Sequence, residues 1–291
     1  MKGWLVVNGF TQTHKFLELY AFLEQSAKRC GVELVRLSTL QVAPLLAGGQ
    51  LSCAKPDFVL FWDKDVRLCK ALELAGCLCI NSAHAIATCD DKALTYLELL
   101  CANVPQPATI LTPKTFHAQE WGATEFPSVV AQTLGLPTVV KECFGSFGAQ
   151  VHLARSASDI AHILDGMESR PSLCQEFVST SAGHDVRLQV VGNQVVAAME
   201  RVSKEDFRAN ITNGGVARPW DPTSEQVDVA LRTCQALGLD FAGVDLLFGK
   251  DDEPVVCEVN SNAHFVNLYH ATGINVADFI LDHAVQKASE G

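Results

Sequence analysis

Three oxygen-bearing side chains near the carboxyl-terminal end of the chain have the spacing of a cation site. Asp245 lies in one strand-like apolar run, and Glu258 and Asn260 lie in the next, beyond a turn-like segment centred on residues 251–252. A hairpin with that centre places Asp245 opposite Glu258, and Asn260 shares the face of Glu258. Oxygen ligands of this kind suit Mg²⁺ or Mn²⁺. The alternative is three polar residues on a solvated sheet face.

A second group of residues has the composition of a phosphate site. A short apolar run ends at Lys141, and the loop Gly145-Ser146-Phe147-Gly148 follows it. Glycines let backbone N–H groups approach an anion, and the lysine supplies a positive charge. The loop lacks the residues of a Walker motif and the third glycine of a dinucleotide-binding fingerprint. The alternative is an ordinary hairpin turn with a surface lysine.

Taken in chain order, these groups and their neighbours resemble the ATP-grasp superfamily and, within it, the RimK-like amino-acid ligases of the glutamate type. No single motif is specific for this superfamily, but the joint order and spacing of the motifs are. The motifs are Asp91-Lys92, Val139-Val140-Lys141, Gly145-Ser146-Phe147-Gly148, Gln175-Glu176-Phe177-Val178, His184-Asp185-Val186-Arg187, Met199-Glu200-Arg201, Asp206-Phe207-Arg208-Ala209-Asn210, Ala242-Gly243-Val244-Asp245 and Glu258-Val259-Asn260.

The resemblance implies that ATP is clamped between two small α+β units and is bound together with Mg²⁺ or Mn²⁺. Residues 175–178 would present backbone groups to the adenine, because an extended segment points its N–H and C=O groups sideways. Asp185 would accept a hydrogen bond from a ribose hydroxyl or, alternatively, pair with Arg187. The implied nucleotide-binding residues are Lys92, Lys141, Ser146, Phe147, Gly148, Gln175, Glu176, Phe177, Val178, Asp185 and Arg187.

Three further residues are expected at the reacting centre. Arg201 and Arg208 carry guanidinium forks that suit phosphate oxygens or a substrate carboxylate, and Asn210 belongs to a loop that would cover the reaction. The γ-phosphate does not need Arg187, Arg201 and Arg208 together. At least one of these arginines is therefore expected to hold a substrate carboxylate, which favours an acidic amino acid or a peptide carboxyl terminus.

The function that the resemblance implies is an ATP-dependent carboxylate–amine ligase. Phosphoryl transfer would convert a small-molecule or peptide carboxylate to an acylphosphate, and an amine acceptor would then displace phosphate to form an amide. The alternatives are an ATP-grasp phosphotransferase and a catalytically silent nucleotide-binding protein. His264 stands where many RimK-like ligases carry an Asn-Pro-Gly-like segment, which puts the usual substrate in doubt; packing against Tyr269 is the other interpretation of His264.

The expected fold class is mixed α/β and α+β. Residues 1–90 alternate strands and helices and predict a parallel-sheet α/β domain, which the resemblance identifies as a pre-ATP-grasp domain. Asp90 or Asp91 caps the next helix. Residues 91–180 would form the central ATP-grasp subdomain, and residues 181–291 the carboxyl-terminal subdomain with the metal site.

The amino-acid composition narrows the classes of molecule that the protein is expected to bind. The 291 residues are 48% hydrophobic and carry a net charge of −11, which argues against non-specific binding to nucleic acid or to an anionic membrane. No apolar run approaches the ~18 residues of a membrane helix. The 11 cysteines form no Cys-x-x-Cys pair and are expected as buried free thiols. We expect a cytoplasmic protein, and the sequence leaves a homo-oligomer open.

Overall fold

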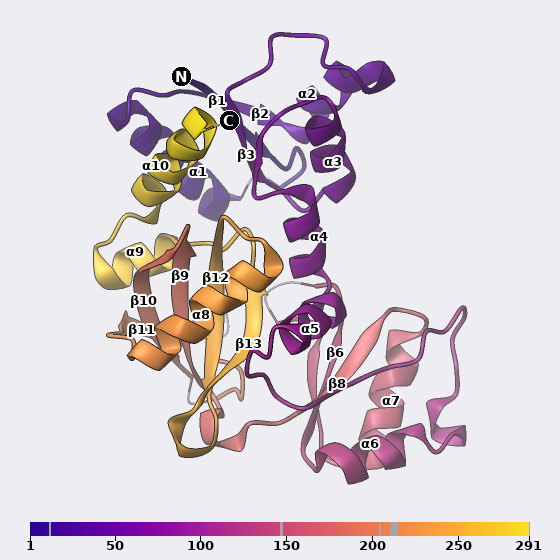
Figure 1. The fold of residues 1–291 in the computed structure, drawn as a ribbon. Coiled ribbons are helices and arrows are strands. Elements are labelled where there is room, and N and C mark those ends of the chain that lie inside the picture. The colour runs from indigo at the N-terminus through magenta and orange to yellow at the C-terminus, as the bar shows by residue number, and fades with distance from the viewer. Residues whose placement is uncertain (12, 146–147, 204, 210–214, 291) are drawn as a thin grey trace.

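The amino-terminal part of the chain forms a parallel sheet with helices on both faces (Figure 1). The computed structural model describes residues 1–11, 13–145, 148–203, 205–209 and 215–290. The sheet has the strand order β2-β1-β3-β4, and its apolar runs are continuous because both faces are covered. Its elements are β1 (Lys2–Val7), α1 (His14–Arg29), β2 (Glu33–Ser38), α2 (Thr39–Val42), β3 (Phe58–Trp62), α3 (Val66–Leu74), β4 (Cys79–Ile80) and α4 (Ala83–Asp90).

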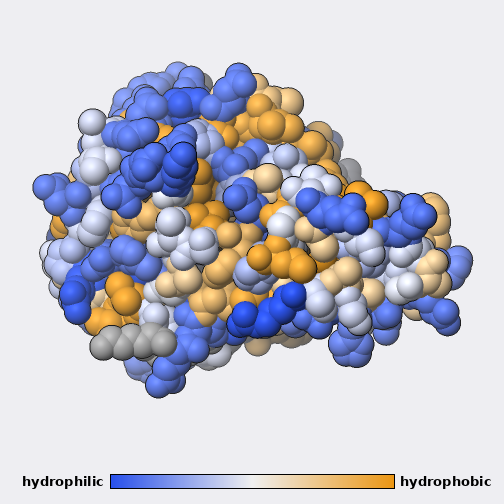
Figure 2. Space-filling view, turned by 90° about the horizontal axis from the view of Figure 1, so that it is seen from below, coloured by the Kyte–Doolittle hydropathy of each residue, from blue (hydrophilic) through white to orange (hydrophobic). Residues whose placement is uncertain are grey.

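A four-stranded antiparallel sheet follows, with the order β5-β8-β6-β7. Helices α6 and α7 pack on it around a separate apolar cluster. This part projects to the right in Figure 1, and also in Figure 2, where apolar patches lie among hydrophilic residues. Its elements are β5 (Thr109–Leu111), α6 (Phe126–Leu134), β6 (Thr138–Glu142), β7 (Val151–Ala154), α7 (Ala157–Met167) and β8 (Ser172–Glu176). Helix α5 (Lys92–Cys101) precedes this part in the chain and packs on α4 and α8.

The third sheet has five antiparallel strands in the order β11-β10-β9-β12-β13. Its elements are β9 (His184–Val191), β10 (Gln194–Val202), β11 (Val216–Pro219), α8 (Ser224–Leu237), β12 (Phe241–Phe248), β13 (Pro254–Asn260), α9 (Val266–Thr272) and α10 (Val276–Glu290). Short 3₁₀ segments occupy Ala43–Gly49, Trp121–Ala123, Ser179–Ser181 and Lys250–Asp252.

The two faces of this third sheet differ in chemistry. Val186, Val244 and Leu246 point to the apolar layer beneath α8. The alternate positions Asp185 and Asp245 therefore point to the opposite face, because side chains alternate along a strand. The sequence alone places the charged residues on one face, and the structure turns that face toward the other two sheets.

The last helix, α10, packs on β9 and β10 of the third sheet and also reaches the amino-terminal sheet. It packs against α1 and β3, so that the carboxyl-terminal end of the chain lies beside the amino-terminal sheet (Figure 1). The division of the chain at residues 90 and 180 stays a prediction. Among the described residues, no helix has the length and apolar character needed to cross a membrane.

One buried side chain joins the amino-terminal sheet to the third sheet. Asn81 is fully buried, and its Nδ2 donates to the carbonyl oxygens of Phe241 and Ser261, both at 2.9 Å. Its Oδ1 accepts from the backbone N–H groups of Asp240, at 2.6 Å, and Phe241, at 3.1 Å. Four hydrogen bonds to backbone groups at the ends of β12 and β13 therefore come from this one side-chain amide.

We predict that Asn81→Ala lowers the free energy of unfolding by about 3 kcal/mol, because it leaves buried backbone groups without partners. Urea unfolding of the variant and the parent measures the difference. Gln119→Ala is the control, since Gln119 is exposed and, among the described residues, donates only to the nearby His117 carbonyl. It should change stability by no more than about 0.5 kcal/mol. A loss below about 1 kcal/mol for Asn81→Ala would show that water replaces the amide.

Candidate active site

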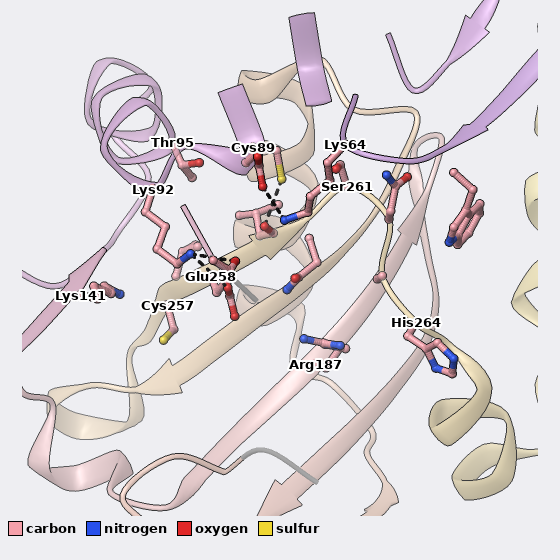
Figure 3. A pocket seen from close by; sticks show the side chains of 18 of the residues that line it. Lys64, Cys89, Lys92, Thr95, Lys141, Arg187, Cys257, Glu258, Ser261 and His264 are labelled. Atoms are coloured by element: carbon pink, nitrogen blue, oxygen red, sulfur yellow. Dashed lines mark hydrogen bonds and ion pairs between the residues drawn. The ribbon is translucent and has the colours of Figure 1, made fainter. Parts of the chain in front are cut away.

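A cavity of about 330 Å³ lies where the three sheets meet (Figure 3). Its wall takes Lys64 from the amino-terminal sheet, Lys141 from the central sheet, and Arg187 and Glu258 from the third sheet. A neighbouring cavity of about 110 Å³ shares several of these residues and extends along the end of β8. The size of the larger cavity is within the range of small-molecule sites.

The hairpin that carries the predicted metal residues has the predicted register. Asp245 on β12 is directly opposite Glu258 on β13, and Gly243 is opposite Asn260. Beyond Asp245 the pairing shifts by one residue, so that Leu246 faces Val256. The β-bulge was not predicted. It leaves Asp245 and Glu258 on the cavity side of the sheet.

Asp245 is 2% exposed and is held by two arginines. Arg187, directly opposite on β9, donates from Nε to Oδ1 at 2.6 Å and from Nη2 to Oδ2 at 2.7 Å. Arg201 Nη2 lies 2.9 Å from Oδ2. Burial alone would raise the pKa of Asp245, but the two guanidinium groups outweigh it and hold that pKa below its ordinary value.

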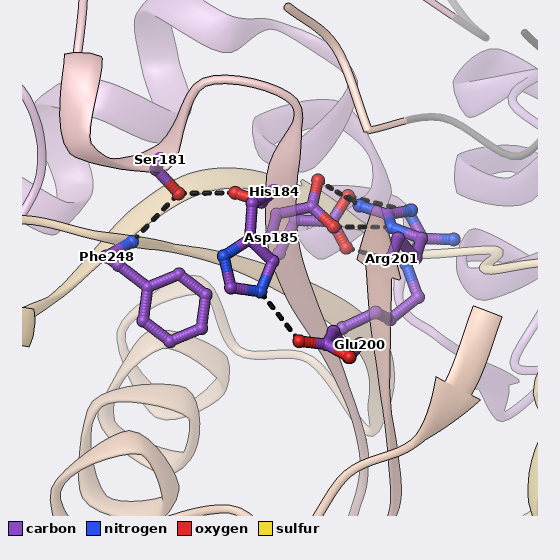
Figure 4. Close-up of polar contacts among 8 residues, drawn as sticks. Ser181, His184, Asp185, Glu200, Arg201 and Phe248 are labelled. Carbon is purple, nitrogen blue, oxygen red and sulfur yellow. Dashed lines mark hydrogen bonds and ion pairs between the residues drawn. The ribbon is translucent and has the colours of Figure 1, made fainter. Parts of the chain in front are cut away.

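Asp185 pairs with Arg201 and not with Arg187. The two residues are opposite each other on β9 and β10, and Arg201 donates to both carboxylate oxygens at 2.6 and 2.7 Å (Figure 4). The alternative partner proposed from the sequence, Arg187, is therefore wrong, because it is taken by Asp245. Burial lowers the pKa of Arg201, but Asp245 and Asp185 raise it above its ordinary value, so Arg201 stays charged.

The residues present fit a divalent cation in part. Glu258 is partly exposed in the cavity and can ligate a cation, whereas the atom of Asn260 that is buried without a partner among the described residues is Nδ2, a donor that cannot. Asp245 has fewer lone pairs free to bind a cation, since Oδ2 already accepts from two arginines and Oδ1 from one. In the described part of the chain no three His, Cys, Asp or Glu side chains gather as a metal site. Substrate phosphates would have to complete the ligand set.

Two cations lie beside the cavity, Lys141 on β6 of the central sheet and Lys92 at the start of α5. Lys141 is only 6% exposed, which excludes the surface-lysine alternative, and it has no carboxylate partner within the described ranges. Lys92 Nζ lies 3.8 Å from Glu258 and 3.5 Å from the Gly145 carbonyl oxygen. A buried ammonium without a carboxylate partner is costly unless an anion joins it. These two cations are therefore well placed for phosphate.

The predicted adenine segment lines the smaller cavity. Gln175 is buried on β8 and donates to Thr109 Oγ1 at 2.8 Å, whereas Glu176 is exposed. The Phe177 ring meets the Phe207 ring edge to face, with centroids 6.1 Å apart. Val178 follows the end of β8 and also lines this cavity.

Arg208 ties two loops together. It pairs with Asp206 at 2.6 Å and donates to the Gly148 carbonyl oxygen at 2.5 Å. The guanidinium group of Arg208 is therefore already hydrogen-bonded to protein groups at the smaller cavity. The predicted residues Ser146, Phe147 and Asn210 lie outside the described residues, so their roles stay predictions.

Residues of the amino-terminal sheet were missed by the sequence reasoning. Lys15, Trp62 and Asp63 line the larger cavity, as do Asn262 and His264. The available signal was positional, since Trp62 ends β3 and Asp63 follows it, and ligands of parallel sheets bind beyond the carboxyl ends of strands. His264 packs edge to face with Phe16, at 6.0 Å between centroids, and not with Tyr269.

A family model described as the RimK-like ATP-grasp domain matches residues 89–284. The chain belongs to the RimK-like ATP-grasp family. It is 32% identical to human N-acetylaspartylglutamate synthase A over 283 residues, covering 89% of this chain and 70% of that protein. It is 32% identical to a probable alpha-L-glutamate ligase of Maridesulfovibrio salexigens, covering 76% of this chain and 72% of that protein.

Other relatives are longer. With beta-citrylglutamate synthase B of Danio rerio the identity is 34%, over 76% of this chain but only 53% of that protein. Among solved structures, a RimK domain ATP-grasp protein from Sphaerobacter thermophilus has a TM-score of 0.74 at 20% identity, covering 97% of this chain and 99% of that one. D-alanine–D-alanine ligase of Bacillus anthracis complexed with ATP has a TM-score of 0.76 at 15% identity, covering 100% and 98%. The predicted ATP-grasp fold and RimK-like family are confirmed.

We predict that Lys141→Met weakens binding of the magnesium–ATP complex ten- to a hundred-fold, on the order of 1.5–3 kcal/mol for a charge-assisted hydrogen bond. The apo protein should not lose stability, because the substitution removes a buried charge. Calorimetric titration with a non-hydrolysable ATP analogue, together with urea unfolding, separates the two effects. Equal affinity in variant and parent would remove Lys141 from the nucleotide site.

Proposed function

We propose that this ATP-dependent amide ligase joins the amine of an amino acid such as glutamate to the carboxylate of a small molecule or peptide. One observation carries the proposal. A single cavity is lined by Lys141, a buried cation that suits phosphate, by Glu258 of the β12–β13 hairpin, and by residues of the amino-terminal sheet. Nucleotide phosphates and a second substrate can therefore meet in one enclosed space.

The chemistry divides among the residues as follows. Lys141 and Lys92 bind the nucleotide phosphates, and Arg201 faces the developing charge on the transferred phosphoryl group. Asp185 and Asp245 hold Arg201 in place from two sides, so its orientation is set before substrates arrive. A divalent cation, when held by Glu258 with help from the phosphates, supplies charge neutralisation and aligns the phosphates.

The reaction then proceeds in two transfers. A carboxylate oxygen attacks the γ-phosphorus, the bond to ADP breaks, and an acylphosphate forms. The amine nitrogen attacks the acyl carbon, loses a proton, and displaces inorganic phosphate. The protein contributes positioning and electrostatic stabilisation, and no nucleophilic side chain is needed.

An acidic substrate fits the arginines. Arg187 lines the larger cavity and uses only Nε and Nη2 in its two bonds to Asp245, which leaves Nη1 for a substrate, whereas Arg208 lines the smaller cavity. We therefore assign the substrate carboxylate to Arg187. The names of two relatives, a probable alpha-L-glutamate ligase and an N-acetylaspartylglutamate synthase, support glutamate as the amine substrate. A cytoplasmic location and an oligomeric state stay predictions.

The test is a mass-spectrometric screen of carboxylate and amine pairs with ATP, counting amide, ADP and phosphate. We predict equal amounts of all three from a productive pair. Glu258→Gln should reduce turnover on the order of 100-fold at limiting Mg²⁺, because a charged ligand becomes neutral with little change in volume. Glu253→Gln, on the exposed turn of the same hairpin, should leave turnover unchanged.

Two results would contradict this account. A stable phosphorylated product without amide would indicate a phosphotransferase. Unchanged turnover of Glu258→Gln at limiting Mg²⁺ would remove Glu258 from the metal site.

A further inference from the structure

Arg208 bridges the two sheets that enclose the smaller cavity. It lies beyond the end of β10 in the third sheet, and its Nη1 donates to the carbonyl oxygen of Gly148, just before β7 of the central sheet. The preceding residue makes a second bridge, since the Phe207 ring meets the Phe177 ring beyond the end of β8. All four residues line the smaller cavity. Two neighbouring residues therefore span the predicted nucleotide site.

The carboxylate of Asp206 sets the direction of the Arg208 side chain. It accepts from Arg208 Nε at 3.0 Å and from Nη2 at 2.6 Å, so one edge of the guanidinium group is held. The carboxylate is itself oriented, because Oδ1 also accepts from the backbone N–H of Arg208 at 2.9 Å. The hydrogen bonds from Arg208 lower the pKa of Asp206, so the pair is charged at neutral pH.

The bonds to Asp206 leave the Nη1 end of the guanidinium group facing the glycine-rich loop. Nη1 donates to the Gly148 carbonyl at 2.5 Å and lies 3.5 Å from the Val151 carbonyl oxygen. A guanidinium group binds charged phosphate oxygens more strongly than neutral carbonyl oxygens. Nη1 can therefore exchange these carbonyls for a phosphate in the cavity while Nε and Nη2 stay bound to Asp206.

Gly183, just before β9, anchors the residues that carry this pair. Its N–H donates to the Phe207 carbonyl and its carbonyl accepts from the Ser203 N–H, both at 2.8 Å. Its φ is +68°, and a Cβ at this position would lie 2.5 Å from the Ser203 carbonyl oxygen and 2.9 Å from that of Asp206. A side chain at position 183 would therefore displace the backbone that positions Asp206 and Arg208.

We propose that Asp206 is a positioning residue, anchored by Gly183, which aims Arg208 Nη1 at the β- and γ-phosphates of the nucleotide. Asp206 lines neither cavity, so it acts on the nucleotide only through Arg208. The assignment rests on the proposed nucleotide site. It gives Arg208 to the phosphates and leaves the substrate carboxylate to Arg187.

The first test changes the carboxylate of Asp206. Asp206→Asn keeps the volume, but an amide NH₂ then faces Arg208 Nη2, which is also a donor. Calorimetry with Mg²⁺ should show a Kd for a non-hydrolysable ATP analogue at least ten-fold higher than in the parent. The Kd for AMP, which lacks the β- and γ-phosphates, should stay within two-fold. Equal weakening of both nucleotides would show a structural role and overturn the proposal.

The matched control for this test is Glu205→Gln. Glu205 is exposed, lines neither cavity, and loses the same charge beside Asp206. Loss of a negative charge alone should leave the binding of an anionic nucleotide unchanged or slightly tighter. We expect both constants of Glu205→Gln within two-fold of the parent. A ten-fold loss of affinity for the ATP analogue in this control would show that Asp206 has no special role.

The second test displaces the anchor. Gly183→Ala should raise the Kd for the ATP analogue at least ten-fold. Gly31→Ala is its control, because Gly31 has nearly the same φ, +69°, and a Cβ there meets no atom within 4 Å. That variant should bind as the parent does, with urea unfolding confirming that both variants are folded. Parent-like affinity in folded Gly183→Ala would remove Gly183 from the account, and if this variant does not fold, the third test decides.

The third test is a double-mutant cycle that shows whether Asp206 acts through Arg208. In an Arg208→Gln background, Asp206→Asn should change the Kd for the ATP analogue by no more than two-fold, because the group that it positions is gone. Independent, multiplying effects of the two substitutions would overturn the proposal.

These binding measurements keep the inference distinct from the proposed function, since none requires amide formation. If the parent binds the ATP analogue and Asp206→Asn binds it equally well, the nucleotide site stands and only the inference fails. If the parent does not bind the analogue, the nucleotide site fails and the inference fails with it.

Discussion

The cavity face of the third sheet depends on a buried network of two carboxylates and two guanidinium groups. Asp185 and Arg201 are opposite each other on β9 and β10, and Arg187 and Asp245 are opposite each other on β9 and β12. Arg201 reaches from one pair to the other. The four charges sum to zero, which makes their burial tolerable, and removal of any one would leave an uncompensated charge. The network therefore fixes the direction of both arginines.

Sheet geometry explains why this network faces the cavities. On β9 the alternation of side chains sends Val186 to the apolar layer under α8 and its two neighbours to the cavity. Asp245 then lies beside Glu258 across the hairpin. Arginine forks, the Glu258 carboxylate of the β12–β13 hairpin and the buried lysine of the central sheet are brought to one place by strand pairing and by the β-bulge after Asp245.

Much of this arrangement was predictable from local signals. The predicted pairing of Asp245 with Glu258 is correct, and alternation set the shared face. The turn itself pairs Leu246 with Val256, and the β-bulge beyond it, which the sequence did not show, brings Glu258 opposite Asp245. The partner of Asp185 was not predictable, because it comes from the register between β9 and β10, which sequence spacing does not show. Helix α4 was missed because nearly every position is buried or half-buried and no polar stripe marks it. Asp63 and His264 line one cavity but belong to distant segments, and so only the folded chain brings them together.

The central claim is that the substrate carboxylate is activated by phosphoryl transfer before the amine attacks. Isotope transfer tests it most directly. With a productive substrate pair whose carboxylate is labelled with ¹⁸O, the account predicts one ¹⁸O atom in the inorganic phosphate for every amide formed, because the acyl C–O bond breaks in the second transfer. Amide formation with unlabelled phosphate would contradict the account, since the carboxylate oxygen would then never have been bonded to phosphorus.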